Sequence, residues 1–298
     1  MITKLPVTQE NYADTMVNVV EPFLRENGEE GFFDGFDGNK IHYESYKASD
    51  PKGVIVISHG FTESAEKFHE VSYNFVLMGF NVFAIDHRGH GKSFRLTSDP
   101  ATVSVDRFED YVKDLKILVK SIVLPSSDNL PLYLYSHSMG GAVAIQYLQQ
   151  YPGDFKKAVL SAPMVLPQCN GMSPGVARAL TTVLGLFGNK HKMVFVYNGF
   201  NPNYSFEDSN DTSKERFDYY HKKRLDNDIY KTSCASYRWV SEAVKVSKKN
   251  LDSERCKKIT IPVLVCKAQV DKSVYGEKED EFVNLLPNGR LVQFEGSR

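Results

Sequence analysis

The sequence predicts an α/β protein with a mostly parallel central sheet, helices on both faces of the sheet and a helical insertion late in the chain. Short apolar runs without polar alternation are typical of strands buried on both faces. They lie at residues 54–57, 82–85, 132–135, 158–160, 263–266 and 291–294. Between several of them, apolar residues recur at every third or fourth position, as in amphipathic helices. Alternating strands and helices favour a parallel sheet with right-handed connections.

The elements before and between the first parallel strands follow from local patterns. Residues 12–24 are expected to form a helix that packs at the edge of the sheet. Two aromatic-rich runs within residues 31–47 flank an Asp-Gly-Asn turn, which predicts an antiparallel hairpin. Apolar stripes at helical spacing predict further helices over residues 68–78 and 108–122. The hairpin therefore leads into the parallel part of the sheet.

The strand and helix alternation stops after Pro163 and resumes at Pro262. We therefore expect an α/β core made of residues 1–163 and 261–298, with residues 164–260 forming a helical cap at the carboxyl edge of the sheet. Within the cap, residues 175–188 are apolar but too short to span a membrane. This helix either packs within the insertion or offers its apolar face to a lipid-like ligand or a membrane surface.

Composition narrows the classes of function. The 298 residues are 42% hydrophobic, and 36 Lys and Arg nearly balance 37 Asp and Glu, which gives no field to hold a nucleic-acid backbone. The first residues, MITKLPVTQENYADTM, lack the layout of a secretory signal, and four cysteines form no CxxC pair. We therefore expect a cytoplasmic protein with reduced thiols and no nucleic-acid partner. No metal or organic cofactor is implied.

The stretch LYLYSHSMGGAVAIQYL, residues 132–148, reads as a strand, a tight turn and a helix. Its turn matches the Gly-x-Ser-x-Gly nucleophile elbow with the first glycine replaced by Ser136. In such a turn the central serine, here Ser138, is pushed above the sheet, and the helix N-terminus favours developing negative charge. Ser138 is therefore the candidate nucleophile. The alternative is an ordinary helix-capping serine.

Four motifs in this order give the chain a family resemblance. They are HGFTE at 59–63, DHRGHGKS at 86–93, SHSMGG at 136–141 and SAPM at 161–164. Together they resemble the monoglyceride lipase and lysophospholipase branch of the α/β-hydrolase family. The likeness covers nearly the whole chain, including YRWVSEA in the insertion, and implies the α/β-hydrolase fold.

The resemblance also implies roles for particular residues. The backbone N–H groups of Phe61 and Met139 would form the oxyanion hole, and Asp271, in the loop after a late strand, would orient the catalytic histidine. Asp280 and Glu281 are alternative acids, but both lie on a predicted helix and fit its solvated face.

Three further residues of the quoted motifs, His59, Asp86 and Arg88, match positions that brace loops in the family. A histidine or ion pair beside a turn usually satisfies backbone groups. We therefore expect these three to be structural.

The catalytic histidine of the family lies just after the final strand, which here reads RLVQFEGSR and ends the sequence at Arg298. All eight histidines precede Asp271: His42, His59, His69, His87, His90, His137, His191 and His221. His137 adjoins Ser138 and fits a packing role, whereas His191 and His221 could reach the site only from the insertion. We expect no catalytic histidine within the 298 residues and poor hydrolysis by this chain alone.

These residues predict a serine carboxylic-ester hydrolase. The resemblance implies single-acyl lipids, either lysophospholipids or monoacylglycerols, as substrates. A serine peptidase on the same scaffold is an alternative, for which Glu207, Asp208 and Asp211 would have to hold a substrate amine. A ligand-binding relative without catalysis is the third interpretation, because one fold supports all three.

Overall fold

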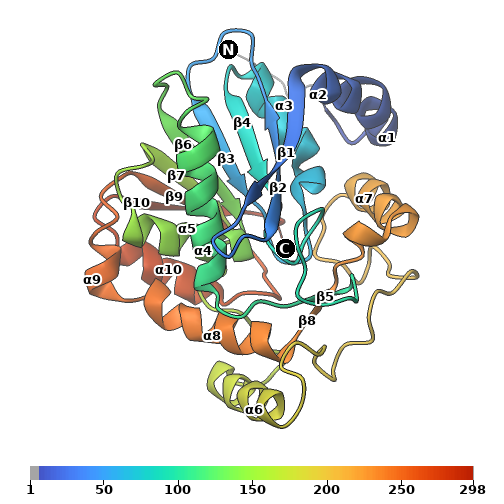
Figure 1. Ribbon diagram of the computed structural model, residues 1–298, viewed down its shortest axis with the longest axis vertical. Helices are drawn as coiled ribbons and strands as arrows, with labels where there is room; N and C mark the ends of the chain where they lie inside the picture. The colour runs from blue at the N-terminus through green and yellow to red at the C-terminus, as the bar shows by residue number, and fades with distance from the viewer. Residues whose placement is uncertain (1–6, 298) are drawn as a thin grey trace.

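The computed structural model describes residues 7–297. The chain forms an eight-stranded sheet with helices on both faces (Figure 1). The strand order is β1-β2-β4-β3-β6-β7-β9-β10. The strands are β1 (Gly28–Asp34), β2 (Lys40–Tyr46), β3 (Val54–Ser58), β4 (Asn81–Ile85), β6 (Leu132–His137), β7 (Lys157–Ser161), β9 (Val263–Ala268) and β10 (Gly289–Phe294). β2 pairs antiparallel with β1 and β4, and the other neighbours are parallel. The predicted hairpin and α/β-hydrolase fold are confirmed.

Helices occur at the positions predicted from residues 12–24, 68–78 and 108–122, after the elbow and within the insertion, and Ser253–Cys256 is an additional one. They are α1 (Tyr12–Thr15), α2 (Glu21–Asn27), α3 (His69–Leu77), α4 (Glu109–Leu118), α5 (Met139–Gln150), α6 (Pro174–Phe187), α7 (Lys214–Asp226), α8 (Tyr237–Asn250), α9 (Ser253–Cys256) and α10 (Gly276–Asn284). The single helix expected over residues 12–24 contains a π-helical turn, Met16–Val20, between α1 and α2. A second such turn, Val119–Val123, continues α4. Residues 1–6, within the stretch that lacks a secretory pattern, and Arg298 lie outside the described residues.

The sheet separates two hydrophobic clusters. Val54 and Val56 of β3 face one cluster, which also contains buried residues of α4, α5 and α8. Ile55 and Ile57 of the same strand face the other cluster, which includes buried residues of α1, α2 and α3. Because successive residues of a strand point to opposite faces, a continuous apolar run supplies both clusters. This packing explains the unbroken apolar runs in the sequence.

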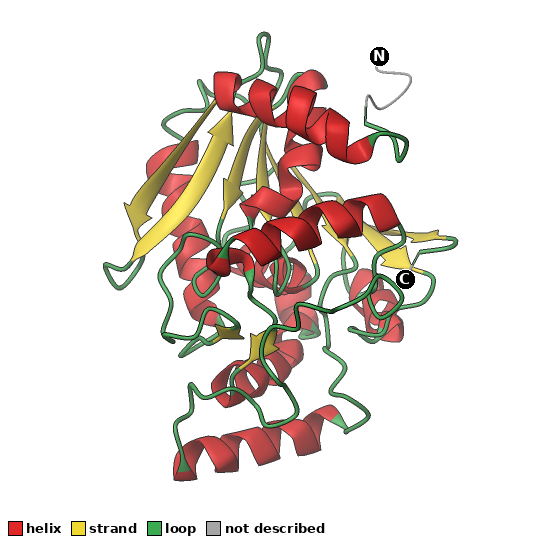
Figure 2. Cartoon of the chain, turned by 90° about the vertical axis from the view of Figure 1, so that its right-hand side faces the viewer, coloured by secondary structure: helices red, strands yellow, loops and turns green. Residues whose placement is uncertain are grey.

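The segment between β7 and β9 contains α6, α7 and α8 and ends with α9 (Figure 2). It also contains β8 (Cys234–Ala235), which pairs parallel with β5 (Thr102–Val103). The sequence patterns did not predict this two-residue ladder. α6 packs on α8, and α8 contributes Trp239 and Ala243 to the core cluster. The division into core and cap at residues 163 and 260 stays a prediction.

Helix α6 carries the most exposed apolar side chains of this segment. Leu186 is 77% exposed and Phe187 is 90% exposed. A cavity of about 580 Å³ lies beside it, lined by residues of α6 and α8 that include Ala179, Val183 and Val244. Within residues 7–297, none of the helices combines the length and the apolar character that crossing a bilayer requires.

Candidate active site

Ser138 occupies the sharp turn between β6 and α5. Its φ of 48° and ψ of −117° are strained for a residue with a side chain. Its backbone N–H donates to the carbonyl of Ser161 over 3.0 Å, and its carbonyl accepts from Met164 over 2.8 Å. Both partners belong to β7 and the loop after it, so the neighbouring strand helps to hold the turn. The Ser138 side chain is half-buried and therefore accessible at the end of the sheet.

Small residues are required where α5 leaves the sheet. A β-carbon on Gly140 would lie 2.1 Å from the carbonyl oxygen of Ser58, and one on Gly141 would lie 2.5 Å from the Cβ of Pro163. Neither distance allows a side chain. Ser136, which stands in place of the first glycine of the motif, is fully buried, and its Oγ has no partner among residues 7–297. The turn therefore accommodates a serine there at the cost of an unpaired hydroxyl.

The loop after β3 lies against the nucleophile candidate. A β-carbon on Gly60 would stand 3.1 Å from the Cβ of Ser138. The next residue in this loop is Phe61, whose ring lies 4.1 Å from that of Trp239, measured between centroids. Among the described residues, no acceptor takes the backbone N–H of Phe61 or of Met139. These two N–H groups are therefore unpaired within the described residues.

His59 braces this loop from within. Its Nε2 accepts the backbone N–H of His87 over 3.0 Å, so the proton lies on Nδ1, which donates to the carbonyl of Gly60 over 2.7 Å. The ring is fully buried, and burial lowers the pKa of His59. Both ring nitrogens are thus used by backbone groups, which agrees with the structural role expected for His59.

Asp86 and Arg88 hold the next loop. The Asp86 carboxylate accepts the N–H groups of Ala65 over 2.7 Å and Lys92 over 2.9 Å. The Arg88 guanidinium forms two bonds to Asp114, with its Nε donating over 2.7 Å. All of these carboxylate and guanidinium groups are buried or nearly so. They tie loops and α4 to the sheet and lie outside the contacts of Ser138.

Glu63 is a buried charge in this loop that the sequence interpretation did not single out. It accepts the N–H of Gly60 over 2.6 Å, pairs with Lys67 at 3.1 Å and lies 3.9 Å from Nε2 of His137. Burial opposes its ionisation, but Lys67, the two nearby histidines and the Gly60 N–H together lower the pKa of Glu63 to about 2. The Glu63 and Lys67 spacing of four residues was the available sequence signal. His137 therefore lies beside this carboxylate.

Asp271 lies in the loop after β9, as its position in the sequence indicated. Its Oδ1 accepts the N–H groups of Ser273 over 2.7 Å and Val274 over 2.9 Å, and its carbonyl accepts from Gln168 over 2.9 Å. These bonds fix the carboxylate at the turn between β9 and α10. No histidine of the described residues contacts it.

The neighbouring acids on α10 differ in environment. Asp280 pairs with Lys267 at 2.6 Å and Glu281 with Lys278 at 2.6 Å, as expected for side chains near a solvated helix face. Glu279, which the sequence interpretation missed, is 1% exposed and its Oε1 has no partner in residues 7–297. Burial and the nearby charge of Asp271 raise the pKa of Glu279 to about 8.

No described histidine takes the position of a general base. His191 of the insertion bonds Ser104 through Nδ1 at 2.8 Å, and His221 donates from Nε2 to the carbonyl of Pro202 over 3.0 Å. Within residues 7–297, the Oγ of Ser138 forms no hydrogen bond with any histidine. Within the described residues, Ser138 thus lies near the backbone N–H groups of Phe61 and Met139 and has no histidine as a base.

Two side-chain groups have spacings compatible with a metal ion: Glu21, Glu66 and His69, and Glu30, His42 and Glu44. In the first group the Lys223 ammonium bridges both glutamates, and in the second Lys92 pairs with Glu30. The lysines already supply positive charge to these carboxylates. We therefore interpret both groups as ion-pair networks.

Comparison with known proteins gives the family. Residues 49–298 match the sequence profile of the family described as serine aminopeptidase, S33. Lysophospholipase L2 of Escherichia coli is 37% identical over 158 residues, which are 53% of this chain and 46% of that protein. Monoacylglycerol lipase of Mycolicibacterium smegmatis is 37% identical over 154 residues, 51% of this chain and 52% of that protein. The matches span about half the length of these curated relatives.

Solved structures agree in fold. A soluble variant of monoglyceride lipase from Saccharomyces cerevisiae, in complex with a substrate analog, has a TM-score of 0.69 at 18% identity, covering 91% of this chain and 87% of that one. Paleococcus ferrophilus monoacylglycerol lipase has a TM-score of 0.67 at 20% identity, covering 86% and 89%. The family match, together with the nucleophile elbow, places the chain in the serine aminopeptidase S33 family, with an α/β-hydrolase fold and with sequence similarity to lysophospholipases and monoacylglycerol lipases.

Proposed function

We propose that this chain is a serine carboxylic-ester hydrolase that acts on lipids with a single acyl chain, either a lysophospholipid or a monoacylglycerol. One observation carries the reaction type: the accessible Ser138 lies in a strained turn against the Gly60 loop, beside two unused backbone donors. The substrate class rests on the relatives, which are named lysophospholipase and monoacylglycerol lipase.

In the proposed reaction, Ser138 Oγ attacks the ester carbonyl and forms an acyl-enzyme with loss of the alcohol. The N–H groups of Phe61 and Met139 bind the oxyanion, for which each preorganised donor typically contributes about 3 kcal/mol. Water then attacks the acyl-enzyme and releases the fatty acid. A base must accept the Ser138 proton and return it to the leaving alcohol.

The base expected from the family resemblance is a histidine, and no histidine of residues 7–297 bonds the Oγ of Ser138. Asp271 would hold its imidazole in the correct tautomer and stabilise the imidazolium. Two backbone N–H groups already occupy Oδ1 of Asp271, so Oδ2 is the oxygen left for the histidine.

Chemical rescue tests this proposal on the 298-residue chain. A fluorophosphonate probe and p-nitrophenyl butyrate are supplied with and without imidazole, with Ser138→Ala as the matched control. We expect imidazole to accelerate both ester hydrolysis and labelling at Ser138, and the variant to show only the background of imidazole in solution. Equal rates for the parent chain and Ser138→Ala, with no label on Ser138, would favour a ligand-binding protein without catalysis.

The same rescued chain distinguishes an esterase from a peptidase. Monoacylglycerol and lysophosphatidylcholine are compared with an aminoacyl naphthylamide. Of the three cap acids considered for an amine site, Asp208 accepts from Ser205 and Asp211 lies 3.8 Å from Lys67. A cation beside Asp211 disfavours binding of a substrate ammonium, so we expect hydrolysis of the lipids only. Cleavage of the naphthylamide alone would replace this proposal with the peptidase.

We also propose peripheral contact of the cap with a membrane surface through α6. Val176, Val183, Leu186 and Phe187 are its exposed large apolar residues. A single-acyl substrate resides in lipid, and apolar residues at the end of α6 could enter the interface. Replacing Leu186 and Phe187 by serine should reduce cosedimentation with phosphatidylcholine vesicles, whereas Leu225→Ser on α7 should not. Unchanged cosedimentation would contradict the contact.

A further inference from the structure

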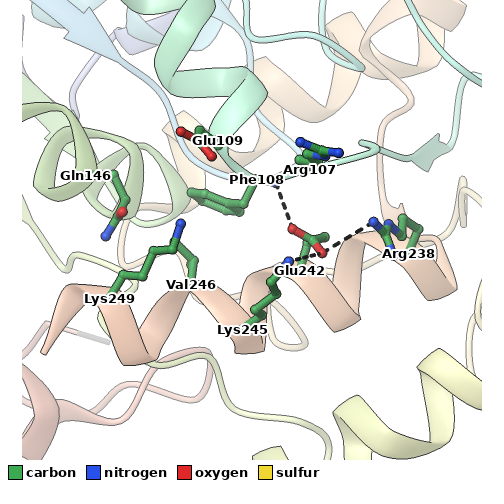
Figure 3. A pocket seen from close by; sticks show the side chains of 9 residues that line it. All are labelled: Arg107, Phe108, Glu109, Gln146, Arg238, Glu242, Lys245, Val246 and Lys249. Atoms are coloured by element: carbon green, nitrogen blue, oxygen red, sulfur yellow. Dashed lines mark hydrogen bonds and ion pairs between the residues drawn. The ribbon is translucent and has the colours of Figure 1, made fainter. Parts of the chain in front are cut away.

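A second cavity lies away from the candidate nucleophile, between the start of α4, α5 and α8. Its volume is about 300 Å³ (Figure 3). Neither Ser138 nor the two proposed oxyanion donors line it. Four cationic side chains do: Arg107, Arg238, Lys245 and Lys249. Two carboxylates, Glu109 and Glu242, share the same wall. The lining therefore has a net positive charge.

The α8 contribution is a regular stripe. Arg238, Glu242, Lys245 and Lys249 are spaced four, three and four residues apart, which places them on one face of a helix. Figure 3 shows this face turned toward the segment that carries Arg107 and Phe108. The Lys249 side chain extends from α8 toward the Phe108 ring in the same view. The buried Phe108 ring thus forms an apolar wall between charged groups.

Glu242 does not compete for a ligand, because its carboxylate is already used. It is 5% exposed, accepts the backbone N–H of Phe108 over 3.2 Å, and pairs with Lys245 at 3.0 Å and Arg238 at 3.5 Å. It therefore caps the first turn of α4 and fixes two cations in the cavity wall. Both cations keep donors that Glu242 does not occupy.

Arg107 and Lys249 have a different status. Within residues 7–297, no acceptor or carboxylate partners either side chain, and Glu109 has no cationic partner. Two unpaired cations beside one unpaired carboxylate fit a ligand that carries more negative than positive charge. A guanidinium and an ammonium are the groups that bind phosphate, through a bidentate fork and a point charge respectively.

We infer that this cavity binds a small phosphate ester that also carries an ammonium or hydroxyl group. Arg107 and Lys249, which lie on either side of Phe108 in Figure 3, supply the positive charge that attracts the phosphoryl group, Glu109 accepts from the ammonium or hydroxyl, and Phe108 packs against the carbon atoms of the ligand. The ligand is either a free phosphate ester or the head group of a phospholipid. No bond is made or broken at this site.

Trp239 lies near the cavity without lining it, so its fluorescence reports occupancy indirectly and calorimetry measures binding itself. Trp239 is the single tryptophan of the chain, it lies on α8 next to Arg238, and its Nε1 donates to the hydroxyl of Tyr111 on α4 over 3.2 Å. The same helices thus hold both the cavity and the indole. Titration with O-phosphoethanolamine and with inorganic phosphate is followed by Trp239 fluorescence and by calorimetry. We expect saturable binding that weakens as NaCl increases.

The test is a double variant that combines Arg107→Gln and Lys249→Gln. The matched control is the single variant Lys248→Gln. Arg107, Lys248 and Lys249 are all exposed, and Lys248 lines the other cavity instead. The double variant should bind O-phosphoethanolamine at least about tenfold more weakly, since two charge-assisted contacts are lost. The control should bind like the parent chain, and thermal unfolding should match among all three.

A third experiment distinguishes a free phosphate ester from a phospholipid head group. It measures cosedimentation of the chain with phosphatidylcholine vesicles that contain or lack phosphatidylethanolamine. If the parent chain binds O-phosphoethanolamine in solution and the double variant does not, the ligand is a soluble phosphate ester. If the parent chain binds vesicles but not the soluble ester, and the double variant does not bind vesicles, the ligand is a phospholipid head group. No saturable binding in either arm, or binding unchanged in the double variant, overturns the inference. Because no turnover is measured, these outcomes are independent of the proposed hydrolase activity.

Discussion

Gly60 and Ser138 are in contact across the candidate active site: a β-carbon on Gly60 would stand 3.1 Å from the Cβ of Ser138. The same atom would lie 2.6 Å from Oε2 of Glu63, the carboxylate that accepts the Gly60 N–H. Position 60 therefore has no room for a side chain on either side. The distance between the nucleophile candidate and the Phe61 N–H depends on this glycine.

Replacing Gly60 by alanine should slow labelling of Ser138 by a fluorophosphonate, measured with imidazole present. The added methyl group pushes the loop away from Ser138, and a displacement near 1 Å typically costs about 100-fold in rate. Gly153→Ala is the control, because a methyl group added there would meet nothing within 4 Å. Equal labelling rates for both variants would show that the Gly60 loop does not contribute to the reaction.

Glu63→Gln should make the free energy of unfolding depend less on pH between pH 7 and pH 2. The folded pKa of about 2 lies below the ordinary value of 4.5, so ionised Glu63 stabilises the fold above pH 4.5 and this contribution is lost as pH falls toward 2. The full difference corresponds to roughly 3 kcal/mol. Urea unfolding at pH 7 and pH 3.5 measures it. A variant whose deficit is the same at both pH values contradicts the assignment.

Glu279→Gln should instead increase the free energy of unfolding relative to the parent chain as pH rises. The folded pKa of about 8 lies above the ordinary value of 4.5, so the contribution of Glu279 is fully present below pH 4.5 and is lost as pH rises through 8. The amide cannot ionise, so the variant should gain roughly 1–3 kcal/mol relative to the parent between pH 5 and pH 8. Urea unfolding at these two pH values provides the measurement. A relative stability that does not change with pH would contradict the buried, protonated carboxyl.

Lys223→Gln should loosen α7 from the rest of the molecule. Lys223 bridges Glu21 of α2 and Glu66 beside α3, and Tyr219 of the same helix donates to Glu21 over 2.5 Å. Removing the ammonium leaves His69, 3.7 Å from Glu66, as the remaining cationic group beside the two carboxylates, which should cost about 2 kcal/mol at pH 7. Lys222→Gln, an exposed neighbour, is the control. Unfolding by guanidinium chloride measures both, and identical midpoints would contradict the bridge.

The elbow and most of the sheet were predictable because their signals are local. A buried strand, a tight turn and an apolar helix follow one another within residues 132–148, and continuous apolar runs marked the other parallel strands. β5 and β8 were not predictable, since each has two residues and forms only through pairing between segments far apart in sequence. The π-helical turn at Met16–Val20 was not predictable either, although the apolar spacing of the surrounding helix was recognisable.

Parts of the site required the folded chain for a different reason. The sequence offers Asp280 and Glu281 as alternative acids on a predicted helix, but Glu279 beside them is the buried acid, because it shares the inward face of α10 with Phe282. Helical spacing from Phe282 was the signal that could have found it. The contact of Gly60 with Ser138, and the partner of the cationic stripe on α8, depend on how separate elements pack. A single sequence contains no direct record of those contacts.

The pairing of β7 with β9 has a consequence for how members of such a fold diversify. Ala158 lies opposite Val263, so the whole segment that carries α6, α7 and α8 is a loop between adjacent strands. The entropy of closing a loop grows only with the logarithm of its length, roughly 0.6 kcal/mol for each doubling. The exposed loops of this segment can therefore be lengthened at little thermodynamic expense, whereas α8, which adds Trp239 and Ala243 to the core, and the turn that holds Ser138 are constrained by their packing.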